Sequence, residues 1–170
     1  MTILETTLTK QQAIQQFREI SKIAKAVIYL KKIDKEMIFR LGKDNNNKIA
    51  HVRHHEDDRP ITSYNKRTKS IVSKRNEIIT YQENKQLYVL AKSGGVSLFD
   101  AMSPKLTLTG KDCWYLVPKN TPIPDGIVIA KDVEPDDNGH FHYAFQPEHD
   151  MLMSTYKEKL AEIGKHMRVV

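Results

Sequence analysis

A serine and two histidines whose types suit nucleotide chemistry fall between residues 93 and 151. Ser97 follows a Gly-Gly turn at residues 94–95, and His140 and His142 belong to a later segment of alternating residues. Alternate side chains of a strand point to one face, so both histidines are expected on the same side. Small residues and a hydroxyl at a tight turn, with histidines on a nearby strand, are typical of the wall of a nucleotide cleft.

The alternation also predicts which face of this segment, residues 140–146, is buried. Its three aromatic residues share one face and are expected in the core: Phe141, Tyr143 and Phe145. The opposite face is expected to line a polar cleft and carries His140, His142, Ala144 and Gln146. An exposed or edge strand with incidental histidines gives the same pattern and is the alternative.

Metal and hydrolase chemistry find less support. His140, His142 and His149 offer three nitrogen ligands for zinc, but no fourth ligand or cysteine accompanies them. A second histidine cluster, within residues 51–58, sits among acidic residues and is typical of a solvated loop. Ser97 and His142 are residue types of a Ser-His hydrolase, yet the nucleophile elbow G-x-S-x-G is absent. We therefore predict no metal site and no hydrolase.

The composition is that of a globular chain with an excess of positive charge. Its 170 residues, 28% charged and 39% apolar, fit one domain or one domain with a helical extension. The net charge of +6 indicates either a solvated basic face or an anionic partner such as a nucleotide, a nucleic acid or an acidic protein. The single cysteine, Cys113, indicates a reducing compartment.

Neither a membrane segment nor a secretory signal is recognisable in the sequence. No apolar run approaches the roughly 20 residues that cross a bilayer. The N-terminus lacks the basic start and apolar core of a signal peptide. We expect no membrane association, and export would need a route without such a peptide.

Hydrophobic spacing predicts helices at both ends and short strands between them. The first helix is expected over residues 9–32, with Thr9 and Gln12 as a capping box, and the last is expected to be capped by Asp150 or Ser154. Strands are expected at residues 36–41, 78–81, 87–91, 113–117, 127–131 and 140–146, with weak helical character at 62–74. This order predicts an α+β fold, with residues 1–35 as an N-terminal helical extension.

Four motifs resemble those of a known family. They are Phe39-Arg40, GGVSLFD at residues 94–100, a proline-rich connector at residues 117–124, and His142-Tyr143 followed by a proline and a methionine. Over about residues 37–160 the chain resembles the Tse-type cytotoxic effectors exported by bacterial type VI secretion, which share the fold of ADP-ribosyltransferase toxins. The resemblance implies an ADP-ribosyltransferase-like split β-sheet core with N- and C-terminal helices, and makes residues 36–170 the toxin domain.

The resemblance implies that NAD is bound as a substrate. Arg40 would contact the diphosphate through paired hydrogen bonds. Phe39 or Phe99 would pack on the nicotinamide, and Gly95 belongs to the cofactor-binding turn.

Three catalytic candidates follow from the same resemblance. Ser97 would order the turn and hold the ribose beside the nicotinamide. His142 occupies the place of the glutamate that ADP-ribosyltransferases usually carry, where it would orient the ribose or the substrate. Glu148 is the other candidate for the glutamate's role, which is to stabilise charge that develops on the ribose.

By this resemblance we expect an antibacterial toxin, exported by the type VI secretion apparatus and active in the recipient cytoplasm as an NAD-dependent ADP-ribosyltransferase-like glycosyltransferase. Its producer would need a cognate immunity protein, and the basic surface predicts an acidic one. The modified target macromolecule stays open. Two alternatives remain: an RNA-acting nuclease with His140 and His142 as acid and base, and a non-enzymatic binding module that inhibits its partner.

Overall fold

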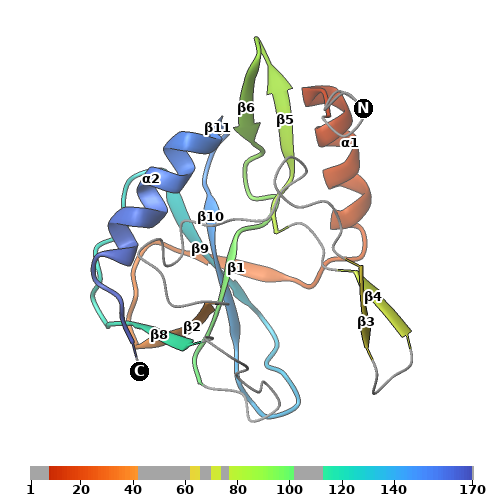
Figure 1. Ribbon diagram of the computed structural model, residues 1–170. Coiled ribbons are helices and arrows are strands. Elements are labelled where there is room, and N and C mark those ends of the chain that lie inside the picture. The colour runs from red at the N-terminus through yellow and green to blue at the C-terminus, as the bar shows by residue number, and fades with distance from the viewer. Residues whose placement is uncertain (1–7, 42–61, 66–69, 74–76, 102–112, 170) are drawn as a thin grey trace.

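The computed structural model spans residues 1–170 and describes residues 8–41, 62–65, 70–73, 77–101 and 113–169 (Figure 1). For residues 37–41, 62–65, 70–73, 113 and 169 it describes the backbone alone. Over these ranges the chain forms two α-helices and twelve strands, arranged in sheets of seven, three and two antiparallel strands. The predicted α+β class is confirmed.

A seven-stranded sheet in the order β1-β9-β10-β7-β2-β8-β12 forms the centre of the fold. Its strands are β1 (Val27–Leu30), β2 (Met37–Leu41), β7 (Val96–Phe99), β8 (Cys113–Val117), β9 (Ile127–Asp132), β10 (His142–Pro147) and β12 (Arg168–Val169). Strand β10 lies between β9 and β7, so both of its edges are hydrogen-bonded. Side chains on β10 are therefore held by two neighbours in a fixed register.

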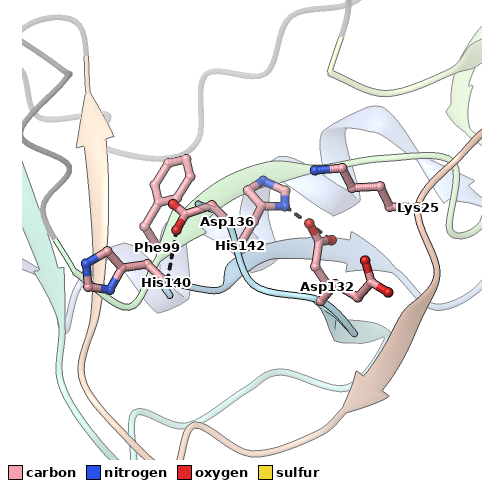
Figure 2. A pocket seen from close by; sticks show the side chains of 7 residues that line it. Lys25, Phe99, Asp132, Asp136, His140 and His142 are labelled. Atoms are coloured by element: carbon pink, nitrogen blue, oxygen red, sulfur yellow. Dashed lines mark hydrogen bonds and ion pairs between the residues drawn. The ribbon is translucent and has the colours of Figure 1, made fainter. Parts of the chain in front are cut away.

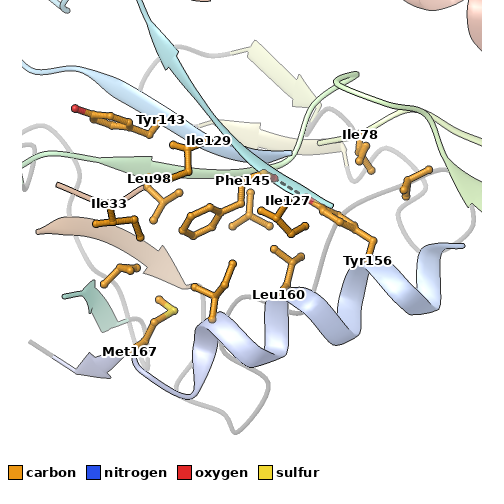
Figure 3. Close-up of a cluster of buried hydrophobic side chains, with 14 of the residues drawn as sticks. Ile33, Ile78, Leu98, Ile127, Ile129, Tyr143, Phe145, Tyr156, Leu160 and Met167 are labelled. Atoms are coloured by element: carbon orange, nitrogen blue, oxygen red, sulfur yellow. Dashed lines mark hydrogen bonds between the residues drawn. The ribbon is translucent and has the colours of Figure 1, made fainter. Parts of the chain in front are cut away.

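The helix α2 (Met153–Gly164) covers one face of this sheet (Figure 3). Tyr156, Leu160 and Ile163, spaced three and four residues apart, are fully buried against the sheet. The Tyr156 hydroxyl donates a 2.6 Å hydrogen bond to the carbonyl oxygen of Phe145 on β10. This bond ties the helix to the central strand in the middle of the apolar core.

The predicted burial of the aromatic residues of β10 is confirmed for two of the three. Tyr143 and Phe145 are 1% and 0% exposed, and Phe141, which lies just before the strand, is partly buried. The strand begins at His142 and ends at Pro147, two residues later than predicted at its start. The earlier residues are drawn into the turn that precedes β10, where the Asp136 carboxylate accepts hydrogen bonds from the backbone N–H groups of Asn138 and His140.

A second sheet and the first helix form a smaller layer. The sheet consists of β5 (Thr80–Glu83), β6 (Gln86–Val89) and β11 (Met151–Leu152). Asn84 and Lys85, both with positive φ, form the two-residue turn of the predicted β5–β6 hairpin, which is confirmed. The helix α1 (Lys10–Ser21) packs on β5 (Figure 1), with Ala13 buried against Ile79 and Tyr81.

The predicted first helix is wrong in its second half. The capping box of Thr9 and Gln12 is confirmed, but α1 ends at Ser21, and Val27–Leu30 forms β1 paired with β9. β-branched and aromatic residues favour a strand once a partner edge is present, and a short apolar run fits both helical and strand spacing. Residues 24–28 therefore do not continue the helical stripe.

Two further predictions of local structure are wrong. Within residues 62–74, the expected weak helix is replaced by strands β3 (Thr62–Asn65) and β4 (Ser70–Ser73), which pair with each other. The helix α2 has Leu152 as its N-cap without a side-chain cap. The carboxylate of Asp150 instead accepts hydrogen bonds from the Tyr81 hydroxyl at 2.7 Å and the Ala91 backbone N–H at 2.8 Å, so tertiary contacts take the place of the cap.

The first 35 residues contribute to the central sheet as well as to α1. Strand β1 forms an edge of that sheet, and Ile33 is fully buried in its core. The division at residue 35 stays a prediction. Among the described residues, neither helix is both long and apolar enough to traverse a bilayer.

Candidate active site

Ser97 and His142 meet on the polar face of the central sheet. In the β7–β10 register, His142 lies opposite Phe99, and Ser97 lies two residues further along β7 opposite Ala144. Diagonal neighbours of this kind remain within reach of long side chains. The His142 Nε2 atom lies 3.0 Å from the Ser97 Oγ atom, so the two residues share a hydrogen bond.

Asp132 approaches His142 from the other neighbouring strand. Because Tyr143 pairs with Lys131, the next residue of each strand, His142 and Asp132, also lie side by side. The Asp132 Oδ1 atom is 3.6 Å from the His142 Nδ1 atom, and the side chain of Asp132 is 16% exposed. Ser97 on β7, His142 on β10 and Asp132 on β9 therefore lie in a row across three adjacent strands.

His142 and Asp132 line a pocket of about 480 Å³ (Figure 2), and Ser97 is linked to it through its hydrogen bond with His142. The lining side chains of the pocket come from the segment before β1, from β7, from the end of β9, from the segment between β9 and β10, and from the start of β10: Lys25, Phe99, Asp132, Glu134, Asp136, His140 and His142. The Phe99 ring is tilted by 60° against the His142 ring, with 5.4 Å between their centroids. Phe99 thus forms an aromatic wall beside the imidazole.

His140 lines the same pocket but belongs to a different set of contacts. Its Nδ1 atom lies 3.7 Å from the Asp100 Oδ1 atom. Asp100 also accepts hydrogen bonds from the Phe141 backbone N–H and from the Lys35 ammonium, both at 3.1 Å. Hydrogen bonds to Tyr143 and Asp100 raise the pKa of Lys35, so this cation stays charged beside the carboxylate. Asp100 therefore fastens the turn before β10 to the end of β7.

The charge in the pocket is predominantly negative. Three carboxylates, of Asp132, Glu134 and Asp136, line it with one lysine, Lys25. Opposite charges attract strongly where protein partly excludes water, so the pocket favours a group that carries or develops positive charge. A phosphate would be repelled at this point and would have to bind elsewhere.

Gly95 acts through its lack of a side chain. A Cβ atom at this position would lie 1.9 Å from the carbonyl oxygen of Phe145 and 3.0 Å from the Tyr156 hydroxyl. The glycine therefore allows β7 to begin close against β10 and α2. This close approach sets the position of Ser97 two residues later.

Arg40 and Phe39 lie on β2, which neighbours β7 in the sheet. Ile38 of β2 pairs with Phe99, so the backbone of Arg40 is two residues from the wall of the pocket. The side chains of Phe39 and Arg40 lie outside the described part of the chain. Their contacts with a phosphate or a nicotinamide remain predictions.

Glu148 does not join Ser97 and His142. It follows the other end of β10, six residues beyond His142, which corresponds to about 20 Å of extended chain. Its carboxylate accepts a 2.6 Å hydrogen bond from the Lys31 ammonium. This bond holds the pKa of Glu148 below its usual value, so the carboxylate is ionised and paired.

Gln146 shares the polar face of β10 with His142 and Ala144. Its Oε1 atom is buried and has no hydrogen-bond partner among the described residues. Buried amide oxygens are normally satisfied, so this atom is available to a donor from outside the described part.

Metal ligation finds no geometric support in the ranges that the structure describes. Within them, no group of three or more His, Cys, Asp or Glu side chains is arranged to hold an ion. The histidines of residues 51–55 lie outside these ranges. The absence of a metal stays a prediction.

Sequence reasoning missed Asp132 and Asp100. Each is the polar residue at or just beyond the end of a largely apolar strand, which is a weak signal by itself. Their contact with the histidines follows from strand order and register, which the sequence did not supply.

An α+β fold whose central sheet carries a serine–histidine pair beside an open pocket is consistent with the ADP-ribosyltransferase class. Residues 37–169 match the Tse2 ADP-ribosyltransferase toxin family. The match covers most of the chain, so the protein belongs to this family and has its ADP-ribosyltransferase-like fold. It is thus a toxin with ADP-ribosyltransferase-like activity, and the resemblance drawn from its motifs is confirmed. A search of curated proteins finds no match.

Proposed function

We propose that this toxin cleaves NAD between the nicotinamide and its ribose and transfers ADP-ribose to a macromolecule in the cytoplasm of a recipient bacterium. The observation that carries the proposal is the position of His142, which lines a 480 Å³ pocket and shares a 3.0 Å hydrogen bond with Ser97. A pocket of this size accommodates the nicotinamide and its ribose.

The charge of the pocket suits the reaction. The nicotinamide ring of NAD is positively charged, and positive charge moves onto the ribose as the glycosidic bond breaks. Asp132 and Glu134 would stabilise that developing charge, which is the task that a glutamate usually performs. Phe99 would pack on the nicotinamide ring, and Arg40 would hold the diphosphate.

The acidic pocket argues against the nuclease alternative. A phosphodiester at His140 and His142 would meet three carboxylates, which repel its negative charge. A non-enzymatic binding role gives no reason for the alignment of Ser97, His142 and Asp132.

Nicotinamide release from NAD by the purified protein, with and without recipient lysate, tests the proposal. We expect Ser97→Ala and His142→Ala to lower the rate by about 100-fold or more. Ser154→Ala and His149→Ala are matched controls, because both residues are exposed and lie beyond the far end of β10; they should keep the wild-type rate. Absence of nicotinamide release, together with absence of NAD binding, would refute the proposal.

The remaining expectations belong to the same proposal. Delivery would use the type VI secretion apparatus, and the modified macromolecule would be identified by labelling recipient lysate with a tagged NAD. An acidic immunity protein would bind the basic toxin, whose net charge is +6. We expect its association rate to fall at least about tenfold between about 50 mM and about 300 mM salt, because screening weakens electrostatic steering. A salt-independent rate would contradict charge-driven binding.

A further inference from the structure

We propose that Asp132, His142 and Ser97 form a proton relay in which the Asp132 carboxylate orients the imidazole, and that the acceptor of ADP-ribose is a hydroxyl group. The inference rests on the proposed function and adds to it a positioning residue and the chemistry of the acceptor. It starts from two distances to one ring, 3.0 Å from Nε2 to Ser97 Oγ and 3.6 Å from Nδ1 to Asp132 Oδ1.

The carboxylate determines which nitrogen of the ring carries the proton. A neutral imidazole has one N–H donor and one acceptor nitrogen. An ionised carboxylate beside Nδ1 favours the proton on that nitrogen. The Nε2 atom of His142 is then an acceptor, and the Ser97 hydroxyl donates its hydrogen to it.

This direction of the hydrogen bond makes Ser97 Oγ an acceptor on its other side. An acceptor hydroxyl that reaches the partly exposed Ser97 would donate to its Oγ atom. As the bond between the acceptor oxygen and the C1′ atom forms, its proton would pass to Ser97 Oγ while the serine proton passes to His142 Nε2. The C1′–nitrogen bond breaks, its electron pair leaves with neutral nicotinamide, and the imidazolium is stabilised by the Asp132 carboxylate.

The other acidic residues of the pocket do not fill this role. The Asp136 carboxylate holds its own turn through the backbone N–H groups of Asn138 and His140, both at 2.9 Å. Glu134 is exposed and makes no hydrogen bond or ion pair with His142 in the described part of the chain. The Asp132 carboxylate lies 3.6 Å from the Nδ1 atom of His142.

The ¹⁵N chemical shifts of the imidazole nitrogens test the relay without NAD. At a pH where the ring is neutral, we expect wild-type His142 to carry its proton on Nδ1. Asp132→Asn should shift the proton toward Nε2, because the amide can donate to Nδ1. Glu134→Gln removes the same charge from the same pocket and should leave the tautomer unchanged. A wild-type ring protonated on Nε2 would overturn the proposal, whether or not any variant folds.

The rate of ADP-ribose transfer provides the second arm. Asp132→Asn should lower nicotinamide release by about 10- to 100-fold, and Asp125→Asn, at an exposed carboxylate outside the lining of the pocket, should change it less than about threefold. ADP-ribose adducts on hydroxyl groups resist hydroxylamine and acid. Lysate that the wild type has labelled should therefore retain its label after treatment with hydroxylamine or acid. Loss of the label with hydroxylamine, or an Asp132→Asn rate equal to the wild-type rate, would overturn the inference while NAD cleavage itself still stood. No NAD cleavage by the wild type would refute the proposed function and, with it, the transfer role of the relay.

Discussion

At the residue scale, the proposed site would use a histidine and an aspartate in place of the single glutamate that ADP-ribosyltransferases usually carry. A neutral histidine cannot supply the negative charge of a glutamate, but His142 lies 3.6 Å from the Asp132 carboxylate. The carboxylate provides the charge, and the imidazole provides a nitrogen that can accept a proton. The residue that sequence comparison places at the catalytic position is therefore only part of the group that would act there.

Tyr156 gives a prediction for stability and its pH dependence. Burial raises the pKa of Tyr156 far above its usual value. Tyr156→Phe should lower the free energy of unfolding by about 1–2 kcal/mol near neutral pH, because the bond to the Phe145 carbonyl is lost. In the unfolded chain the tyrosine ionises near pH 10, so its contribution to stability is present below that pH and is lost above it.

The difference in the free energy of unfolding between the wild type and Tyr156→Phe should consequently shrink by about 1.4 kcal/mol between about pH 9 and about pH 11. Urea unfolding at the two pH values measures it. Tyr29→Phe, at a tyrosine that is 44% exposed, is the control and should show no such change. A constant difference for Tyr156→Phe would mean that Tyr156 ionises equally in both states.

At the element scale, the site depends on how closely β7 approaches β10. Ser97 and Phe99 alternate with buried Val96 and Leu98, so the pairing that fills the core also places Phe99 at the pocket and Ser97 beside His142. A shift of one residue would exchange the two sets. Gly95 is the residue that allows this pairing to begin where it does.

Gly95→Ala should therefore destabilise the protein by about 3 kcal/mol or more, because its Cβ atom would overlap the Phe145 carbonyl oxygen. Gly139→Ala is the matched glycine control, since its Cβ atom would meet nothing within 4 Å. Because Gly139 has a positive φ, an alanine there should still lower the free energy of unfolding by about 1–2 kcal/mol. Denaturant unfolding of the two variants gives the comparison, and equal losses would show that the close approach of β7 to β10 is not limiting.

Prediction of elements succeeded where the pattern was local. The β5–β6 hairpin, strand β8 and the buried positions of α2 follow from alternation, turn residues and helical spacing. The segment at β1 was misassigned because its apolar residues fit a helix equally well, and only the free edge of β9 makes it a strand. Asp150 was misassigned as a cap because its partners, Tyr81 and Ala91, are distant in sequence.

At the scale of the whole molecule, the first 35 residues connect both layers of the fold. The helix α1 covers the β5–β6 hairpin, and β1 closes one edge of the central sheet. The Lys31 ammonium bridges Glu148 and the Ile127 carbonyl oxygen on the neighbouring part of the chain.

Two truncations test whether residues 36–170 fold alone. Removal of residues 1–35 exposes the edge of β9 and takes Ile33 from the core; Ile33→Ala alone should cost about 3 kcal/mol. We expect this truncation to be unfolded or aggregated. Removal of residues 1–22 keeps β1 and should leave a folded protein with a lower melting temperature, measured by circular dichroism and size-exclusion chromatography. A native melting temperature without residues 1–35 would establish residues 36–170 as an independent domain.

The sequence by itself determined the α+β class, six of the twelve described strands and the residue types of the site, because alternation, turn chemistry and motif order are local properties of the chain. Ser97, His142 and Phe99 were identified in this way, and the structure brings Phe99 and His142 to one pocket, with Ser97 hydrogen-bonded to His142. Only the tertiary structure decided that Asp132 joins them and that Glu148 lies at the other end of β10. These placements depend on the order and register of strands distant in sequence, which packing of the whole sheet selects.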